Sequence, residues 1–397
     1  MDLDRYNFTV SQKNILKNIM TDFKMWNENN IEKSIFLKYE NCYQGKQLSK
    51  KIFEYIVSSH KNLKENENDY KIFKNLRHKA NNFSYQTINK NGFGLGACPV
   101  ASEGTRCCNL LTLDVVESCG FDCSYCSIQS FYAHNKIGFD KNLKTKLKNI
   151  KLDPKQIYHI GTGQSSDSLL WGNREGILDA LFDFAFSNPN VILEFKTKSN
   201  NITYFIKNKN KIPKNIIVTW SLNTPTIISN EEHLTSSLEQ RLSSARALSD
   251  IGVLIGFHFH PIIQYKDYLS EYKELYKKVQ ELFTFEEVIL ISFGTLTFTK
   301  PVINKLRQRA VNTKVLQMPF ETINNKQSYC LKTKLEMFKV AYDSFKSWHH
   351  KVYFYLCMED KSLWKQIFGY EYSSNNQFED FMLNSYMDKI NKKDLKT

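Results

Sequence analysis

The sequence has no apolar run that approaches the roughly 18 residues needed to cross a membrane. Its first residues, MDLDRYNFTVSQKN, contain acidic side chains and lack the apolar core of a secretory signal. The nine cysteines are an odd number and are clustered, which is unlike the framework of a disulfide-stapled protein. We therefore expect a cytoplasmic protein with no membrane partner, whose clustered cysteines indicate metal or redox chemistry.

The composition is that of a globular protein with a basic surface. Of its 397 residues, 42% are hydrophobic and 14% are aromatic, which excludes a disordered chain. Lys and Arg together number 54 against 41 Asp and Glu, giving a formal charge of +13. This excess suits a polyanionic partner such as nucleic acid. A general bias toward Lys and Asn, visible in IKNKNKIPKN, is the alternative explanation.

The patterns divide the chain into three regions. Residues 1–105 are predicted to form a helical, basic N-terminal region, because QKNILKNIMTDFKMW and GKQLSKKIFEYIVSS repeat apolar positions every three or four residues. Residues 106–320 alternate strands with helices. Residues 321–397 contain a helix, a strand (KVYFYLC) and another helix, and we expect them to form a small α/β cap.

Six short apolar, β-branched runs in the middle region predict the strands. They are NLLTLDVV, QIYHIGTG, VILEFKTK, NIIVTWSL, VLIGFHF and EVILISFG. Helical stretches such as LEQRLSSARALSD lie between them, so the strands should be parallel with right-handed crossovers. The fold class predicted is α/β, a partial (β/α)6 TIM-like barrel, whose chemistry would lie at the C-terminal ends of the strands.

Three cysteines follow the first predicted strand in the sequence ESCGFDCSYCSIQ. Cys119, Cys123 and Cys126 have the spacing C-x3-C-x2-C. Closed zinc sites and standard four-iron clusters take four ligands, whereas three thiolates can hold three corners of an iron–sulfur cube and leave one iron free. The alternative is a zinc knuckle that borrows Cys107, Cys108 or a histidine.

This loop resembles that of the radical SAM superfamily. The resemblance implies that Cys119, Cys123 and Cys126 hold a [4Fe-4S] cluster whose free iron binds S-adenosylmethionine. Reduction by a protein such as flavodoxin or ferredoxin would then cleave the cofactor to methionine and a 5′-deoxyadenosyl radical, which takes hydrogen from a substrate. Tyr125, the aromatic residue before the last cysteine, stands at the family position beside the adenine, and a catalytic role for it is a further hypothesis.

Later segments resemble the spore photoproduct lyase family, over about residues 105–310. They are IGTGQSSDSL, EFKTKSN, WSLNTP, the helix motif S-x-L-E-x-R and FTKP. The resemblance implies a lyase-like radical SAM enzyme of DNA repair. It also implies cofactor-binding roles for Gly161, Thr162, Gly163, Lys198, Ser221 and Asn223. The same residues also fit a turn, a solvated lysine and a helix cap. His258 and His260 share one face of a strand, either as metal ligands or as packed barrel residues.

The sequence departs from that family where a hydrogen atom must be returned to the substrate. Spore photoproduct lyases use a cysteine in the glycine-rich segment after the second strand, but Gly163–Asp167 contains none. Ser127 also replaces the tyrosine that follows the last cluster cysteine. Either Cys330 or Cys357 supplies the thiol, or the chain acts on another substrate, which we favour. Cys98, Cys107 and Cys108 are ligands of an auxiliary cluster or buried spectators.

Two other functions are consistent with these patterns. One is a radical SAM enzyme that acts on a peptide or a small metabolite. The other is a non-enzymatic, zinc-dependent nucleic-acid-binding protein. Iron, sulfide and zinc analysis separates the second from any radical enzyme.

Overall fold

The computed structural model describes residues 1–28, 30–71, 73, 83–89, 95–98, 104–130, 136–309, 311–323 and 325–393. These residues form two compact units. The helical unit comprises the described residues up to position 78 together with Gln264–Tyr268 and Thr297–Cys330. The sheet unit comprises the described residues of 79–263, Leu269–Leu296 and those from Leu331 onward. No described helix is long and apolar enough to cross a membrane.

The helical unit confirms the helices expected near the N-terminus. It contains α1 (Val10–Met25), α2 (Ile31–Ile35), α3 (Gly45–Glu65) and α10 (Lys300–Arg309), and a three-stranded antiparallel sheet of β13 (Thr297–Thr299), β15 (Lys326–Ser328) and β14 (Glu321–Ile323). Helix α1 begins at a capping box in which Thr9 and Gln12 satisfy each other's backbone amides. The buried Asp22 carboxylate accepts two hydrogen bonds of 2.8 Å from Arg307, which ties α1 to α10.

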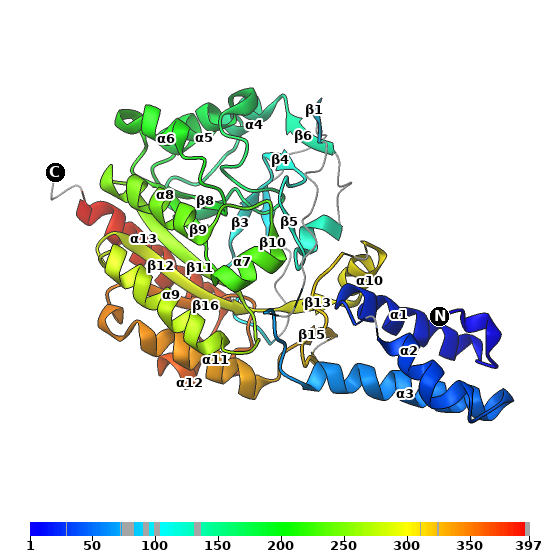
Figure 1. Cartoon of the computed structure of the whole chain (residues 1–397). Coiled ribbons are helices and arrows are strands. Elements are labelled where there is room, and N and C mark those ends of the chain that lie inside the picture. Colours follow the sequence, from blue (N-terminus) through cyan, green and yellow to red (C-terminus); the bar gives the residue numbers. More distant parts are fainter. Residues whose placement is uncertain are drawn as a thin grey trace. The chain divides into compact units, whose positions relative to one another are not determined.

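The sheet unit is built on an eight-stranded curled sheet, a half-barrel (Figure 1). The strand order is β16-β12-β11-β9-β8-β7-β3-β2, and every pairing is parallel except that of β2 with β3. The bounds are β2 Leu95–Ala97, β3 Leu111–Leu113, β7 Tyr158–Gly161, β8 Val191–Thr197, β9 Ile216–Ser221, β11 Leu254–Ile262, β12 Val288–Thr295 and β16 Tyr353–Leu356. The α/β half-barrel prediction is therefore confirmed, with its six strands in sequence order.

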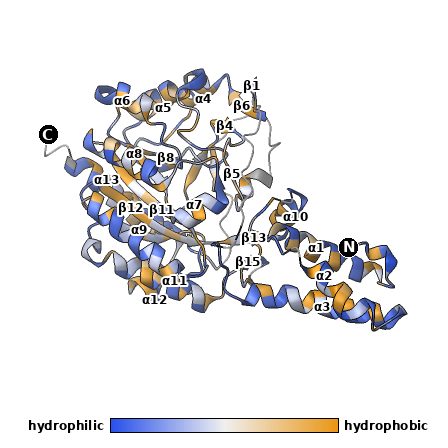
Figure 2. Ribbon diagram, viewed as in Figure 1, coloured by the Kyte–Doolittle hydropathy of each residue, from blue (hydrophilic) through white to orange (hydrophobic). Residues whose placement is uncertain are grey.

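Helices pack on the outside of this sheet (Figure 1). They are α4 (Leu143–Lys148), α5 (Ile177–Ser187), α6 (Thr203–Lys207), α7 (Pro225–Glu231), α8 (Leu238–Asp250), α9 (Tyr268–Leu282), α11 (Leu331–Ser344) and α12 (Ser362–Phe368). Helix α13 (Asn375–Lys393) covers the inner face, where its Tyr386 contacts the His159 and Tyr353 rings. Strands covered on both faces are mainly apolar, and all eight residues of β12 are buried. Figure 2 shows this contrast between hydrophobic central strands and helices with hydrophilic outer surfaces.

Two small sheets are separate from the eight-stranded sheet. One has the order β1-β6-β4, with β1 at Ser84–Ile88, β6 at Lys136–Asp140 and β4 at Val116–Glu117. The other pairs β5 (Asp122–Cys123) with β10 (Glu232–His233), so that Cys123 lies opposite Glu232. This short pairing joins the cysteine loop to a segment more than one hundred residues later in the chain.

Candidate active site

A cavity of about 170 Å³ lies at the C-terminal ends of the parallel strands. Its lining comes from the cysteine loop, from the segments that follow β7 and β8, from the end of β9 and from β11. The lining residues are Cys119, Phe121, Cys123, Cys126, Ile128, Gly163, Gln164, Ser166, Asp167, Lys196, Thr197, Lys198, Ser221 and His260. This is the edge of the sheet where chemistry is expected in such folds.

The cysteine loop brings three thiols to this one cavity. Gly120 allows the loop to pack against the Trp171 ring, because a Cβ atom at this position would lie only 2.8 Å from that ring. Burial raises the pKa of Cys119 to about 12 and that of Cys123 well above its ordinary value, so metal binding would displace protons from both. Among the described residues, no three His, Cys, Asp or Glu side chains form a ready-made site for a metal ion. Three thiols on one wall are nevertheless the donor set that suits an iron–sulfur cluster.

A cluster of charged side chains is hydrogen-bonded to the cysteine loop through Tyr125. The Glu232 carboxylate lies 2.6 Å from Nη2 of Arg241 and 3.7 Å from Nζ of Lys198. Tyr125 donates its hydroxyl hydrogen to Glu232 and accepts a 3.0 Å hydrogen bond from Lys198. Burial alone would raise the pKa of Glu232, but Arg241 and Lys198 lower it to about 2. Glu232 is therefore an anion that balances two buried cations.

Lys198 remains charged although only 15% of its side chain is exposed. Burial disfavours its ammonium, but the Glu232 carboxylate and Cys123 raise its pKa above the ordinary value. Its Nζ lies between Tyr125 and Glu232, and Lys198 also lines the cavity. A fixed cation on this wall can pair with a carboxylate of a bound ligand.

The glycine-rich segment after β7 is fastened to the end of β8. The Asp167 carboxylate accepts hydrogen bonds of 2.7 Å from the Lys198 amide and from the Thr197 hydroxyl. A Cβ atom on Gly163 would lie 2.6 Å from the Lys196 carbonyl oxygen. Only glycine therefore lets this segment pass so close to the end of β8.

The structure separates the predicted site residues into two groups. Those on the cavity wall are Cys119, Cys123, Cys126, Gly163, Lys198 and Ser221, and those outside its lining are Tyr125, Gly161, Thr162 and Asn223. Asn223 is fully buried, donates to the Pro261 carbonyl at 3.0 Å and accepts from the Tyr272 hydroxyl at 2.6 Å. Asn223 therefore holds backbone near the cavity in place and does not line the cavity itself.

Several lining residues were not predicted from the sequence. Asp167 and Lys196 lie within quoted motifs, but nothing in the motifs singled them out, and His260 was considered only as a metal ligand or packing residue. Arg241 carried a signal, because it is the arginine of S-x-L-E-x-R. It has no exposed surface and donates to the Ser221 carbonyl at 2.8 Å.

Cys357 is the additional thiol that lies near the cavity. Cys357 directly follows β16, and its amide donates a 2.8 Å hydrogen bond to the Phe293 carbonyl oxygen. A Cβ atom on Gly294 would lie 3.2 Å from the carbonyl oxygen of Cys357 and 3.3 Å from the His260 ring. Its thiol interacts electrostatically with Lys196, and burial raises its pKa to about 12. Cys330 belongs to the helical unit.

Further thiols gather behind Cys357. The thiol of Cys107 is hydrogen-bonded to that of Cys108, and both interact electrostatically with Cys357, as does Cys98. The three cysteines for which the sequence suggested an auxiliary cluster or a spectator role thus lie near one another and near a fourth.

A curled parallel half-barrel with a three-cysteine loop after its first parallel strand is the architecture of radical SAM proteins. Within that class, the family model of spore photoproduct lyase matches residues 45–347. The chain belongs to the spore photoproduct lyase family.

Individual relatives support the same grouping. Spore photoproduct lyase from Clostridium acetobutylicum is 27% identical over 210 residues, which cover 51% of this chain and 61% of the relative. The match thus spans less than two thirds of that relative's length. Two solved structures, a spore photoproduct lyase variant with bound AdoMet and dinucleoside spore photoproduct and a spore photoproduct lyase complexed with the dinucleoside, each have a TM-score of 0.58. Each is 17% identical and is aligned over 68% of this chain and 82% of its own, a likeness that shows the fold.

Proposed function

We propose that this protein is a radical SAM enzyme that acts on a nucleobase lesion or a related target in nucleic acid, DNA more than RNA. The observation that carries the proposal is the cavity in which Cys119, Cys123 and Cys126 meet Lys198 and the open space beside Gly163. A [4Fe-4S] cluster on the three thiolates would supply the electron that cleaves S-adenosylmethionine and generates the hydrogen-abstracting radical.

The chain's own residues would orient that cofactor. Lys198 provides a buried positive charge for its carboxylate, and Tyr125 and Glu232 fix the position of the ammonium. Ser221 also lines the cavity and provides a hydroxyl, and Gly163 lets its segment approach the Lys196 carbonyl oxygen more closely than any other residue could. Tyr125 and Asn223 would act as positioning residues, because neither belongs to the cavity lining.

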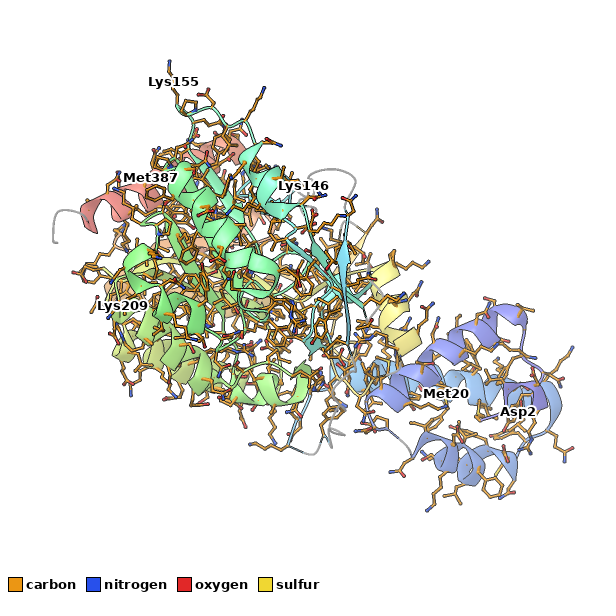
Figure 3. The ribbon with its side chains drawn as sticks, turned by 90° about the horizontal axis from the view of Figure 1, so that it is seen from above. Asp2, Met20, Lys146, Lys155, Lys209 and Met387 are labelled. Atoms are coloured by element: carbon orange, nitrogen blue, oxygen red, sulfur yellow. The ribbon has the colours of Figure 1, made fainter. Side chains whose placement is uncertain are left out.

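The charge of the chain supports a nucleic-acid substrate. The formal charge is +13, and exposed lysines such as Lys155 and Lys209 project from the sheet unit (Figure 3). Spore photoproduct lyase of the same fold has been solved in complex with a dinucleoside lesion. If this chain binds DNA through phosphates, the logarithm of its affinity should fall steeply with the logarithm of salt concentration. A flat salt response would contradict this substrate class.

The residue that returns a hydrogen atom to the substrate must differ from the one in spore photoproduct lyases. Gly163–Asp167 contains no cysteine, and hydroxyl and amide hydrogens are held too strongly to replace a thiol. We infer that Cys357 is the donor, since its thiol interacts electrostatically with Lys196 of the cavity lining. The missing cysteine favours, as the second candidate function, a radical SAM enzyme that acts on a peptide or a small metabolite.

Anaerobic reconstitution tests the proposal directly. The full chain is reconstituted with iron and sulfide and incubated with dithionite, S-adenosylmethionine and the dinucleoside spore photoproduct. The expected result is a brown protein that forms 5′-deoxyadenosine and repaired dinucleoside. The Cys123→Ala variant should lose both activities, whereas Cys42→Ala, which changes an exposed cysteine of the helical unit, should keep them.

Three outcomes discriminate among the functions. Cofactor cleavage without repair would support the radical enzyme and reject the lyase reaction. A colourless protein with about one zinc per chain would support the zinc-dependent binder. Replacement of dithionite by flavodoxin or ferredoxin tests the expected physiological reductant. The cytoplasmic location remains a prediction from the sequence.

A further inference from the structure

A chain of hydrogen-bonded polar side chains runs through the interior of the half-barrel and ends at the cavity. His159 on β7 lies 2.8 Å from Glu194 on β8, and Glu194 lies 2.7 Å from Nε2 of His258 on β11. Nδ1 of His258 lies 2.6 Å from the Ser292 hydroxyl on β12, which lies 3.0 Å from Nε2 of His260. Barrel interiors are usually filled by apolar side chains, and a buried polar network is stable only when its hydrogen bonds are satisfied.

The direction of these hydrogen bonds is set by Glu194. Burial would raise its pKa, but His258 and His159 hold the pKa well below the ordinary value, so the carboxylate is ionised and only accepts. It also accepts a 2.5 Å hydrogen bond from Thr219. Burial, together with Lys196, lowers the pKa of His258 to about 4, so its ring is neutral and carries one N–H. That N–H must be on Nε2, facing Glu194, which leaves Nδ1 as an acceptor.

The same reasoning fixes the tautomer of His260. The single hydroxyl hydrogen of Ser292 is donated to Nδ1 of His258, so the Ser292 oxygen accepts from Nε2–H of His260. Burial, Lys196, His258 and Lys198 all lower the pKa of His260, and Glu194 opposes them only in part. His260 is therefore neutral, with its hydrogen on Nε2 and a lone pair on Nδ1.

We propose that His260 presents an unprotonated Nδ1 to the cavity as the hydrogen-bond acceptor that selects a substrate carrying an N–H group. The inference rests on the proposed function, in which this group is the imide N–H of a thymine ring. An imide places its N–H between two carbonyl oxygens. The ammonium of Lys196, which also lines the cavity, is a donor for a carbonyl oxygen, and His260 supplies the acceptor that a lysine lacks.

A pair of dinucleosides tests the selection. The spore photoproduct dinucleoside and its N3-methylated form, which lacks the imide N–H, are bound to the reconstituted protein with S-adenosylmethionine. The native protein should prefer the unmethylated form by roughly 10- to 100-fold, the range for one hydrogen bond to a buried partner. His260→Asn, whose amide oxygen can occupy the place of Nδ1, should retain the preference. His260→Gln, whose amide falls near the place of Nε2, should lose it.

The outcomes of that experiment are decisive for the inference. No preference in the native protein would overturn it, and so would an equal preference in His260→Gln, which would indicate exclusion of the methyl group by shape. Cofactor cleavage without substrate checks that each variant keeps its cluster and fold. If the native protein cleaves the cofactor but binds neither dinucleoside, the nucleobase substrate is wrong, and the tautomer measurement decides whether His260 is an acceptor.

Nitrogen NMR of the full chain labelled with [15N]histidine measures the tautomer without any substrate. The His260 signals are assigned by their loss in His260→Gln, and Nδ1 should resonate as an unprotonated nitrogen. Ser292→Ala removes the bridge to His258 and should shift this signal toward a mixture of tautomers, whereas Ser292→Thr keeps the hydroxyl and the native signal. A protonated Nδ1 in the native chain, or no response to Ser292→Ala, would overturn the assignment.

Discussion

Replacement of Glu232 by Gln should destabilise the cysteine loop more than any exposed charge change. The Glu232 and Arg241 side chains are 1% and 0% exposed, and their charged groups lie 2.6 Å apart. The neutral amide would remove the anion and leave the Arg241 and Lys198 cations uncompensated in a buried site. Breaking a buried ion pair from one side costs about 3–5 kcal/mol. Because Glu232 pairs with Cys123 across β10 and β5, the same change should reduce the iron bound per chain.

Urea unfolding followed by far-UV circular dichroism, with iron analysis after reconstitution, measures both effects. Glu239→Gln is the matched control, because Glu239 lies on the same helix as Arg241, is 64% exposed on its side chain and contacts only Lys278, at 3.4 Å, among the salt bridges found. An exposed pair of this kind contributes about 0–1 kcal/mol. Equal unfolding midpoints for the two variants would refute the argument that Glu232 balances buried cations.

Two further predictions concern the sheet unit. The pKa of His258 is lowered from 6.5 to about 4, so between these values the unfolded chain takes up a proton that the folded chain excludes. The contribution of neutral His258 to the free energy of unfolding is complete above pH 6.5 and falls by about 3 kcal/mol as the pH drops to 4. Urea titrations of the native chain and His258→Gln should converge over that range, and parallel curves would contradict it. Gly163→Ala should cost about 1–3 kcal/mol and weaken binding of S-adenosylmethionine, because its Cβ would clash with Lys196, whereas Gly96→Ala meets no atom within 4 Å and should be neutral by the same titration and by calorimetry.

The strands could be predicted from the sequence because burial on both faces requires continuous apolar runs. The six predicted runs became β3, β7, β8, β9, β11 and β12. KVYFYLC was also predicted as a strand, but its addition to the sheet beside β12 was not, because the partner of an edge strand is not encoded locally. Helix α13 was not predicted, since NNQFEDFMLNSYMDKINKK has only a weak apolar stripe.

The site could be predicted only as far as its residues stand in contiguous motifs. The three cysteines, Gly163, Lys198 and Ser221 reach the cavity as their motifs suggested. Glu232 and Glu194 acquire their importance from long-range pairing. Glu232 meets Cys123 through β10 and β5, and Glu194 stands in an apolar run where nothing shows that two histidines will face it.

The last prediction concerns the hydrogen atom that Cys357 would return to the substrate. A substrate held by His260 would lie near Lys196 of the same cavity, and the Cys357 thiol interacts electrostatically with Lys196. If a substrate radical takes its hydrogen atom from Cys357, the S–H bond breaks, a C–H bond forms and a thiyl radical remains, beside further thiols at Cys98 and Cys107.

Thiol hydrogens exchange with solvent, so a reaction in D2O should give a product with one deuterium in the native protein. Cys357→Ala should still cleave S-adenosylmethionine but lose most of the deuterated product. Cys330→Ala tests the other cysteine that the sequence offered as donor, and if Cys357 is the donor it should match the native protein. Mass spectrometry of the product measures the label. An unchanged deuterium content in Cys357→Ala would exclude this thiol as the donor.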